Sequence, residues 1–115
     1  MKVSFQGIGE SVVTFYNSRT NGAISGEPVK MSGNGEVAHC ADGDRFFGVA
    51  LASDGGFAAV QTDGYAEINY SGIAPAVGFT KLAADGTGGV KTSETGGEFL
   101  VVEVDATNKT VGLML

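Results

Sequence analysis

Residues 46–61 read FFGVALASDGGFAAVQ, and this stretch decides the fold class. Residues 46–52 are the most apolar run of the chain, and residues 57–61 follow them after the breaker Asp54-Gly55-Gly56. Short apolar runs bounded by Gly and Asp are typical of strands, and a brief turn between two such runs predicts a hairpin. We expect residues 46–52 to form a central strand that is buried on both faces.

The same pattern continues in both directions from this hairpin. The chain has 115 residues, and its 19 Gly against 2 Pro call for many tight turns. The runs rich in β-branched and aromatic residues are 10–16, 28–31, 36–39, 46–52, 57–61, 65–70, 79–83, 90–92, 98–104 and 110–115. The sequence therefore predicts an all-β fold, a small barrel or sandwich of about ten short strands. We expect one domain, residues 10–115, after an N-terminal arm of residues 1–9.

The chain also resembles itself. Residues 26–31 (GEPVKM) align with residues 78–83 (GFTKLA), and residues 43–49 (GDRFFGV) align with residues 96–102 (GGEFLVV). The first alignment is offset by 52 residues and the second by 53, so a one-residue insertion reconciles them.

This similarity predicts a fold built from two similar halves. We infer a pseudo-repeat of residues 23–61 and 76–115, joined by a connector of residues 62–75, with Val60 equivalent to Leu113. Two copies are too few for a solenoid, but they can form a compact barrel or sandwich with internal pseudo-symmetry.

Composition excludes several classes of function. Thirteen acidic residues against seven basic ones give a net charge of −6, which argues against a nucleic-acid partner because Lys and Arg supply most phosphate affinity. No apolar run approaches the ~20 residues that span a bilayer, so we expect no membrane partner and no secretion signal. One Cys and one His exclude an intramolecular disulfide and the usual zinc-binding sets. We expect no metal and no cofactor.

Catalytic chemistry has one candidate, the adjacent pair His39 and Cys40. A Cys nucleophile needs an imidazole on its own side of the backbone, whereas neighbours on a strand point to opposite faces. The Asp-Gly pairs offer carboxylates, but a calcium site needs about six converging oxygen ligands, and Asp-Gly is the usual chemistry of a turn. We therefore expect no catalytic residue. The enzymatic alternative is a small hydrolase, with converging carboxylates or His39 at the base of a cleft.

Aromatic residues mark the candidate contact surface. Tyr65, Tyr70 and Phe79 lie in or near the predicted connector, where the similarity of the halves breaks, and aromatic residues are enriched at protein–protein contacts. In the arm, Phe5 and Ile8 could order against a partner as an added strand, a mode that uses main-chain hydrogen bonds. The alternative for the four aromatic residues is ordinary burial in the core.

The order of the motifs resembles that of the small capsid decoration, or cement, proteins of tailed bacteriophages and prophages. The resemblance covers roughly residues 24–115. It is carried by Gly-Glu-Pro-Val at 26–29, Phe-Phe-Gly-Val-Ala at 46–50, Gly-Ile-Ala-Pro-Ala-Val-Gly at 72–78 and Val-Gly-Leu-Met-Leu at 111–115. Residues 40–45 have no counterpart in that pattern, and the two Phe before Gly48 replace a smaller Ile.

This resemblance implies a non-enzymatic structural protein. Members of the group are all-β, are frequently trimeric, and bind the outside of an icosahedral shell after it expands. The expected partners are a major capsid protein and further copies of the chain, as a homotrimer. The expected location is the capsid surface of the virion, and the host cytoplasm during assembly. The alternative is a carbohydrate- or receptor-binding β-module of a phage tail or cell surface, which predicts an exposed aromatic platform.

Overall fold

The computed structural model describes residues 11–115, which form ten strands and no helix. The strands are β1 (Ser11–Asn17), β2 (Pro28–Gly33), β3 (Glu36–His39), β4 (Gly48–Ser53), β5 (Phe57–Asp63), β6 (Tyr65–Asn69), β7 (Gly78–Ala84), β8 (Val90–Thr92), β9 (Gly97–Asp105) and β10 (Thr110–Met114). The predicted all-β fold is confirmed. Within the described residues, no helix is long and apolar enough to cross a membrane.

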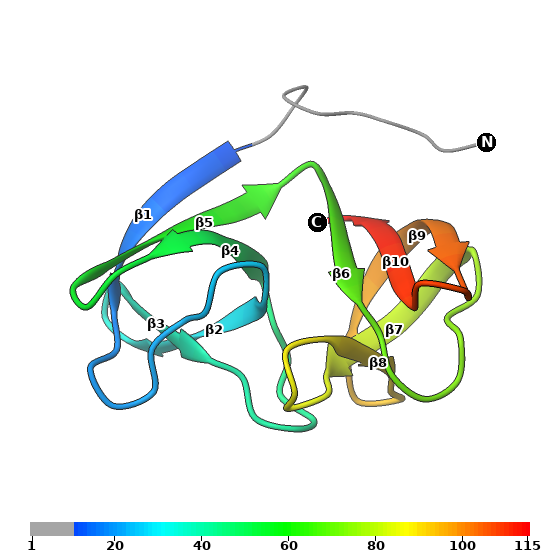
Figure 1. Ribbon diagram of the computed structural model, residues 1–115, viewed down its shortest axis with the longest axis horizontal. Coiled ribbons are helices and arrows are strands. Elements are labelled where there is room, and N and C mark those ends of the chain that lie inside the picture. Colours follow the sequence, from blue (N-terminus) through cyan, green and yellow to red (C-terminus); the bar gives the residue numbers. More distant parts are fainter. Residues whose placement is uncertain (1–10) are drawn as a thin grey trace.

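The ten strands form two units that lie side by side along the longest axis of the molecule (Figure 1). In the first unit, β1–β5 close into a barrel in the order β1-β3-β2-β4-β5. In the second unit, β6–β10 form a five-stranded sheet in the order β6-β10-β9-β7-β8. A single parallel bridge between Tyr70 and Val90 joins the two edges of this sheet, so the second unit is a nearly closed barrel.

The two units share one topology. The pair Val13 and Val60 in the first unit has its counterpart in Ala66 and Leu113 in the second, 53 residues later. The parallel pairing of Asn17 with Val37 likewise matches the bridge between Tyr70 and Val90. The predicted equivalence of Val60 and Leu113 therefore agrees with the strand pairing.

The structural units are wider than the predicted pseudo-repeat of residues 23–61 and 76–115. The predicted connector, residues 62–75, contains β6, which is the counterpart of β1 and the first strand of the second unit. Sequence similarity does not reveal this equivalence because β1 reads SVVTFYN and β6 reads YAEIN.

The predicted alignments within the halves are also shifted. Val29 is equivalent to Leu82, an offset of 53 rather than 52, because both pair with the third strand of their unit in the same way. Bulges at Leu51 in β4 and Val102 in β9 set these strands at an offset of 51, so Phe46 and Phe99 are not equivalent. The cause is the loop before the fourth strand, which is residues 40–47 in the first unit and only residues 93–96 in the second.

Residues 40–47, which we call the strap, connect the two cores. Cys40 and Phe46 are buried in the core of the second unit, where the Phe46 ring stacks on Phe99 with 4.7 Å between centroids. Phe47 instead packs against the core of the first unit and meets Phe15 edge-on. The predicted central strand therefore begins only at Gly48, because the two Phe serve different cores. The prediction that it is buried on both faces is wrong, since Leu51, Ala52 and Ser53 are exposed.

Backbone and ionic bonds hold the strap in place. The Gly43 N–H donates to the Ala84 carbonyl over 2.8 Å, and the Ala84 N–H donates to the Asp44 carbonyl over 2.9 Å, so the strap extends the second sheet beside β7. The Asp44 carboxylate accepts hydrogen bonds from the Lys30 amino group and the Ala41 N–H, which together lower its pKa. Lys91 of β8 pairs with Asp42 at 2.7 Å.

Replacement of Phe46 tests whether the strap couples the units. Phe46→Ala leaves a cavity in the second core, and we expect it to lower the free energy of unfolding by about 3–5 kcal/mol. The control, Phe57→Ala, removes an exposed ring and should cost less than about 1.5 kcal/mol. Urea unfolding followed by circular dichroism measures both values. Equal losses in the two variants would show that the strap does not couple the cores.

Candidate interaction surface

The pair His39 and Cys40 is not arranged for nucleophilic catalysis. Cys40 is buried in the second core, and burial, aided by Asp44, raises the pKa of its thiol to about 11. His39 points elsewhere, with its Nδ1 3.1 Å from the Glu27 carboxylate. Among residues 11–115, no group of three or more His, Cys, Asp and Glu side chains is placed to hold a metal ion.

A row of apolar side chains crosses the outer face of the second unit. Phe79 in β7 pairs with Leu100 in β9, Leu100 pairs with Met114 in β10, and Met114 pairs with Tyr65 in β6. Directly opposed residues share one face of a sheet, so these four side chains form a continuous surface, which we call the apolar row. Phe79 is 74% exposed and Leu100 is 38% exposed, whereas Tyr65 and Met114 are half-buried.

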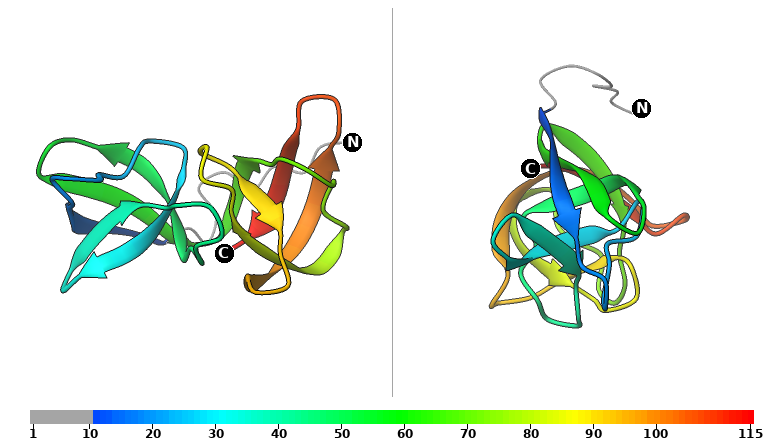
Figure 2. Two further views of the ribbon diagram at one scale, coloured as in Figure 1. Left: turned by 90° about the horizontal axis from the view of Figure 1, so that it is seen from below. Right: turned by 90° about the vertical axis from the view of Figure 1, so that its left-hand side faces the viewer.

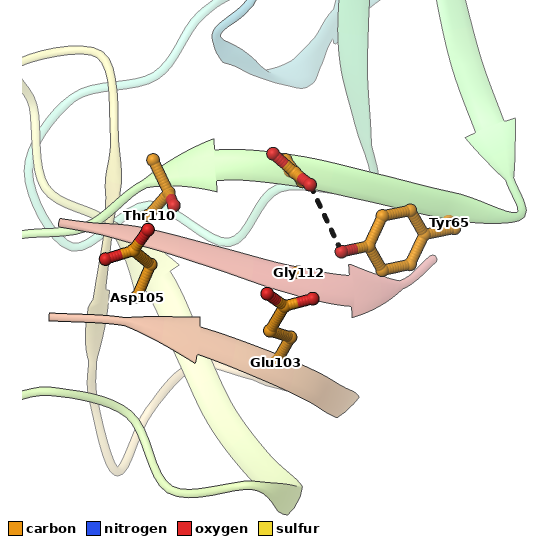
Figure 3. Close-up of a pocket in the computed structure, with 6 residues that line it drawn as sticks. Tyr65, Glu103, Asp105, Thr110 and Gly112 are labelled. Carbon is orange, nitrogen blue, oxygen red and sulfur yellow. Dashed lines mark hydrogen bonds between the residues drawn. The ribbon is translucent and has the colours of Figure 1, made fainter. Parts of the chain in front are cut away.

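Carboxylates border the apolar row on one side. Glu67, Glu103 and Asp105 follow it along β6 and β9 and line a pocket of about 10 Å³, the size of one water molecule (Figure 3). The Tyr65 ring lies over Gly112 at the edge of this pocket, and its hydroxyl group is 3.4 Å from the Glu67 carboxylate. Burial, with the nearby charges of Glu67 and Glu103, raises the pKa of Tyr65 to about 12. The row therefore has an acidic rim.

The five residues predicted to make contacts lie in different places. Tyr65 and Phe79 belong to the apolar row. Tyr70 is buried in the second core, so it is not a surface residue. The alternation of β6 already places Tyr70 on the same face as Ile68, which is why it points inward. Phe5 and Ile8 lie outside the residues that the structure describes.

A second exposed aromatic surface lies on the first unit. Tyr16 of β1 and Phe57 of β5 are opposed in the ladder, both are exposed, and their rings stack with 5.6 Å between centroids. A groove of about 370 Å³ beside Tyr16 is lined by polar side chains that include Arg19 and Glu36. The sequence analysis missed this pair because no local pattern encodes the pairing of β1 with β5, which places Tyr16 opposite Phe57.

No protein-family model matches this sequence, and no curated protein matches it.

Gly112 is the position on which the edge of the apolar row depends. A Cβ added there would collide with the hydroxyl oxygen and ring of Tyr65, whereas Gly55 faces open space. We expect Gly112→Ala to displace Tyr65 and to lower the free energy of unfolding by about 1–3 kcal/mol, as overpacking does. Gly55→Ala is the control and should leave stability nearly unchanged. Urea unfolding and the aromatic NMR signals of Tyr65 measure the two effects, and an unmoved Tyr65 ring in Gly112→Ala would contradict the expectation.

Proposed function

We propose that this protein is a capsid decoration protein, which binds the outer surface of a phage head and stabilises it without catalysing a reaction. The observation that carries the proposal is the apolar row, an exposed Phe and Leu on a sheet that the strap ties to a second barrel. Such a surface suits contact with another protein, since exposed apolar patches rimmed by polar groups mark interaction sites. The motif order that resembles decoration proteins supports the same proposal.

The proposed partners are a major capsid protein and two further copies of the chain. A closed symmetric oligomer bridges neighbouring capsomers, and each added contact becomes effectively intramolecular once the first has formed. The net charge of −6 favours solubility and disfavours contact with the packaged nucleic acid. In this proposal the apolar row serves self-association and the arm, residues 1–9, binds the shell. The protein would reside on the virion surface, after assembly in the host cytoplasm.

Retention on expanded empty heads tests the proposal. The full chain should co-sediment with the heads, and deletion of residues 2–9 should abolish retention without changing the circular dichroism spectrum. The double variant Tyr16→Ala, Phe57→Ala is the matched control and should be retained like the wild type. Normal retention of the truncated chain would show that the arm is not the anchor, and failure of the full chain to bind any expanded head would refute the proposed function.

The stacked pair Tyr16 and Phe57 favours one second function, a carbohydrate-binding module of a phage tail or cell surface. Paired exposed rings beside a polar groove form the aromatic platform that sugar rings need. In this case the wild type should bind a glycan array, and the double variant Tyr16→Ala, Phe57→Ala should lose at least tenfold in affinity by calorimetry. Phe79→Ala is the control, and equal binding by all three proteins would exclude this platform.

A further inference from the structure

Equivalent residues of the two units differ in their exposure to solvent. In the first unit, Val49 and Gln61 are opposed in the ladder, and both are buried where the second unit lies. Val49 is 4% exposed and belongs to the core cluster of the second unit. The equivalent pair in the second unit is Leu100 and Met114, of which Leu100 is 38% exposed. Together with the exposed Lys81, the counterpart of the buried Pro28, this pair forms what we call the open face. In the ladder between β7 and β9, Phe79 is opposed to Leu100 and Lys81 is opposed to Glu98.

The surface of the second unit that meets the first unit also has a counterpart, in the first unit. The first unit rests on the hairpin between β7 and β8, where the strap bonds Ala84, and where Asp42 and Glu27 lie against Gly86 and Gly88. Ala84 is therefore buried.

Within residues 11–115, the hairpin of the first unit that corresponds to β7–β8 has no such cover. Met31, the counterpart of Ala84, is 47% exposed, and Gly33 and Gly35 of the same hairpin are exposed as well. We call residues 31–36 the free hairpin. The free hairpin and the start of β7, beside the open face, lie toward opposite ends of the molecule (Figure 2).

We propose that the open face of one copy binds the free hairpin of a second copy, so that copies associate head to tail as the two units associate within the chain. The open face and the free hairpin are the exposed counterparts of the two surfaces that bury each other where the units meet. Met31 would pack on Leu100 and Met114. The Glu36 carboxylate, which accepts a hydrogen bond from the Ser32 hydroxyl group, would face the amino group of Lys81, which is opposed to Glu98 in the ladder. Opposite charges of this kind fix the register of an interface more than they add affinity.

This contact differs from the internal one in a way that keeps it reversible. The internal contact includes backbone bonds from the strap, whereas the corresponding loop of the second unit, residues 93–96, is shorter. The contact between copies would therefore be made by side chains. Because the two surfaces differ, the association is heterologous: it forms a closed ring if the rotation closes and a filament if it does not. A ring of three copies would satisfy the proposed trimer with six similar units.

The inference rests on the self-association in the proposed function, but not on the binding of a shell. Complementation between two blocked variants tests it. Leu100→Glu blocks the open face and leaves the free hairpin intact, whereas Met31→Glu does the reverse. Leu51→Glu, a strand Leu that is 45% exposed and lies outside both surfaces, is the matched control. Thermal unfolding first establishes that all three variants are folded.

Light scattering coupled to size exclusion measures the masses at equal concentration. The wild type and Leu51→Glu should exceed the protomer mass of 11.7 kDa, and each blocked variant alone should run as a protomer. An equimolar mixture of the two blocked variants should form a heterodimer of twice the protomer mass and grow no further, because one copy still offers a hairpin and the other an open face.

Other outcomes would overturn the inference. If the mixture remains protomeric although each variant blocks assembly, the contact is not head to tail. If only one substitution blocks assembly, or if the wild type is itself protomeric at every concentration tested, the two surfaces do not bind each other. Retention on empty heads is a separate measurement, so loss of shell binding with intact complementation would refute the proposed function and leave this inference standing.

Discussion

The insertion of two consecutive Phe side chains into two different cores is the constraint on which the architecture depends. Neighbouring side chains of an extended chain point to opposite faces, so Phe46 enters the second core while Phe47 packs against the first. A domain of about 60 residues buries only about 60% of its unfolded surface, and a barrel of half this chain would be marginal alone. The strap offsets this weakness because each unit supplies part of the apolar surface that buries the other.

The sequence predicts the local structure well and the relation between the halves less well. Runs such as residues 57–61 and 98–104 combine β-branched or aromatic residues with flanking Gly and Asp, and strands form there because both signals agree. The extent of the repeat was not predictable, because β1 and β6 occupy the same place with different residues. The strap lengthens the loop before the fourth strand of the first unit. Sequence similarity therefore aligned Phe46 with Phe99, although these two residues are not equivalent and their rings stack on each other.

Residues of the candidate surface were predictable from the sequence only where the residue type alone indicates a contact. Tyr65 and Phe79 stand out in the sequence because they are aromatic and lie in or near the predicted connector. Leu100 and Met114 complete the row between them, but this requires the strand order β6-β10-β9-β7, which no local pattern encodes. The proposed decoration function draws on this surface and on the motif order, whereas the internal repetition of the units bears on how copies meet.

The position of Cys40 has a consequence for the study of motion in this molecule. The thiol is the single sulfhydryl of the chain, and it is sealed at the point where the strap enters the second core. A thiol-specific reagent in solution can modify it only after that junction opens. The rate of Cys40 modification in dilute denaturant therefore reports how readily the two barrels separate, and the measurement needs no engineered label.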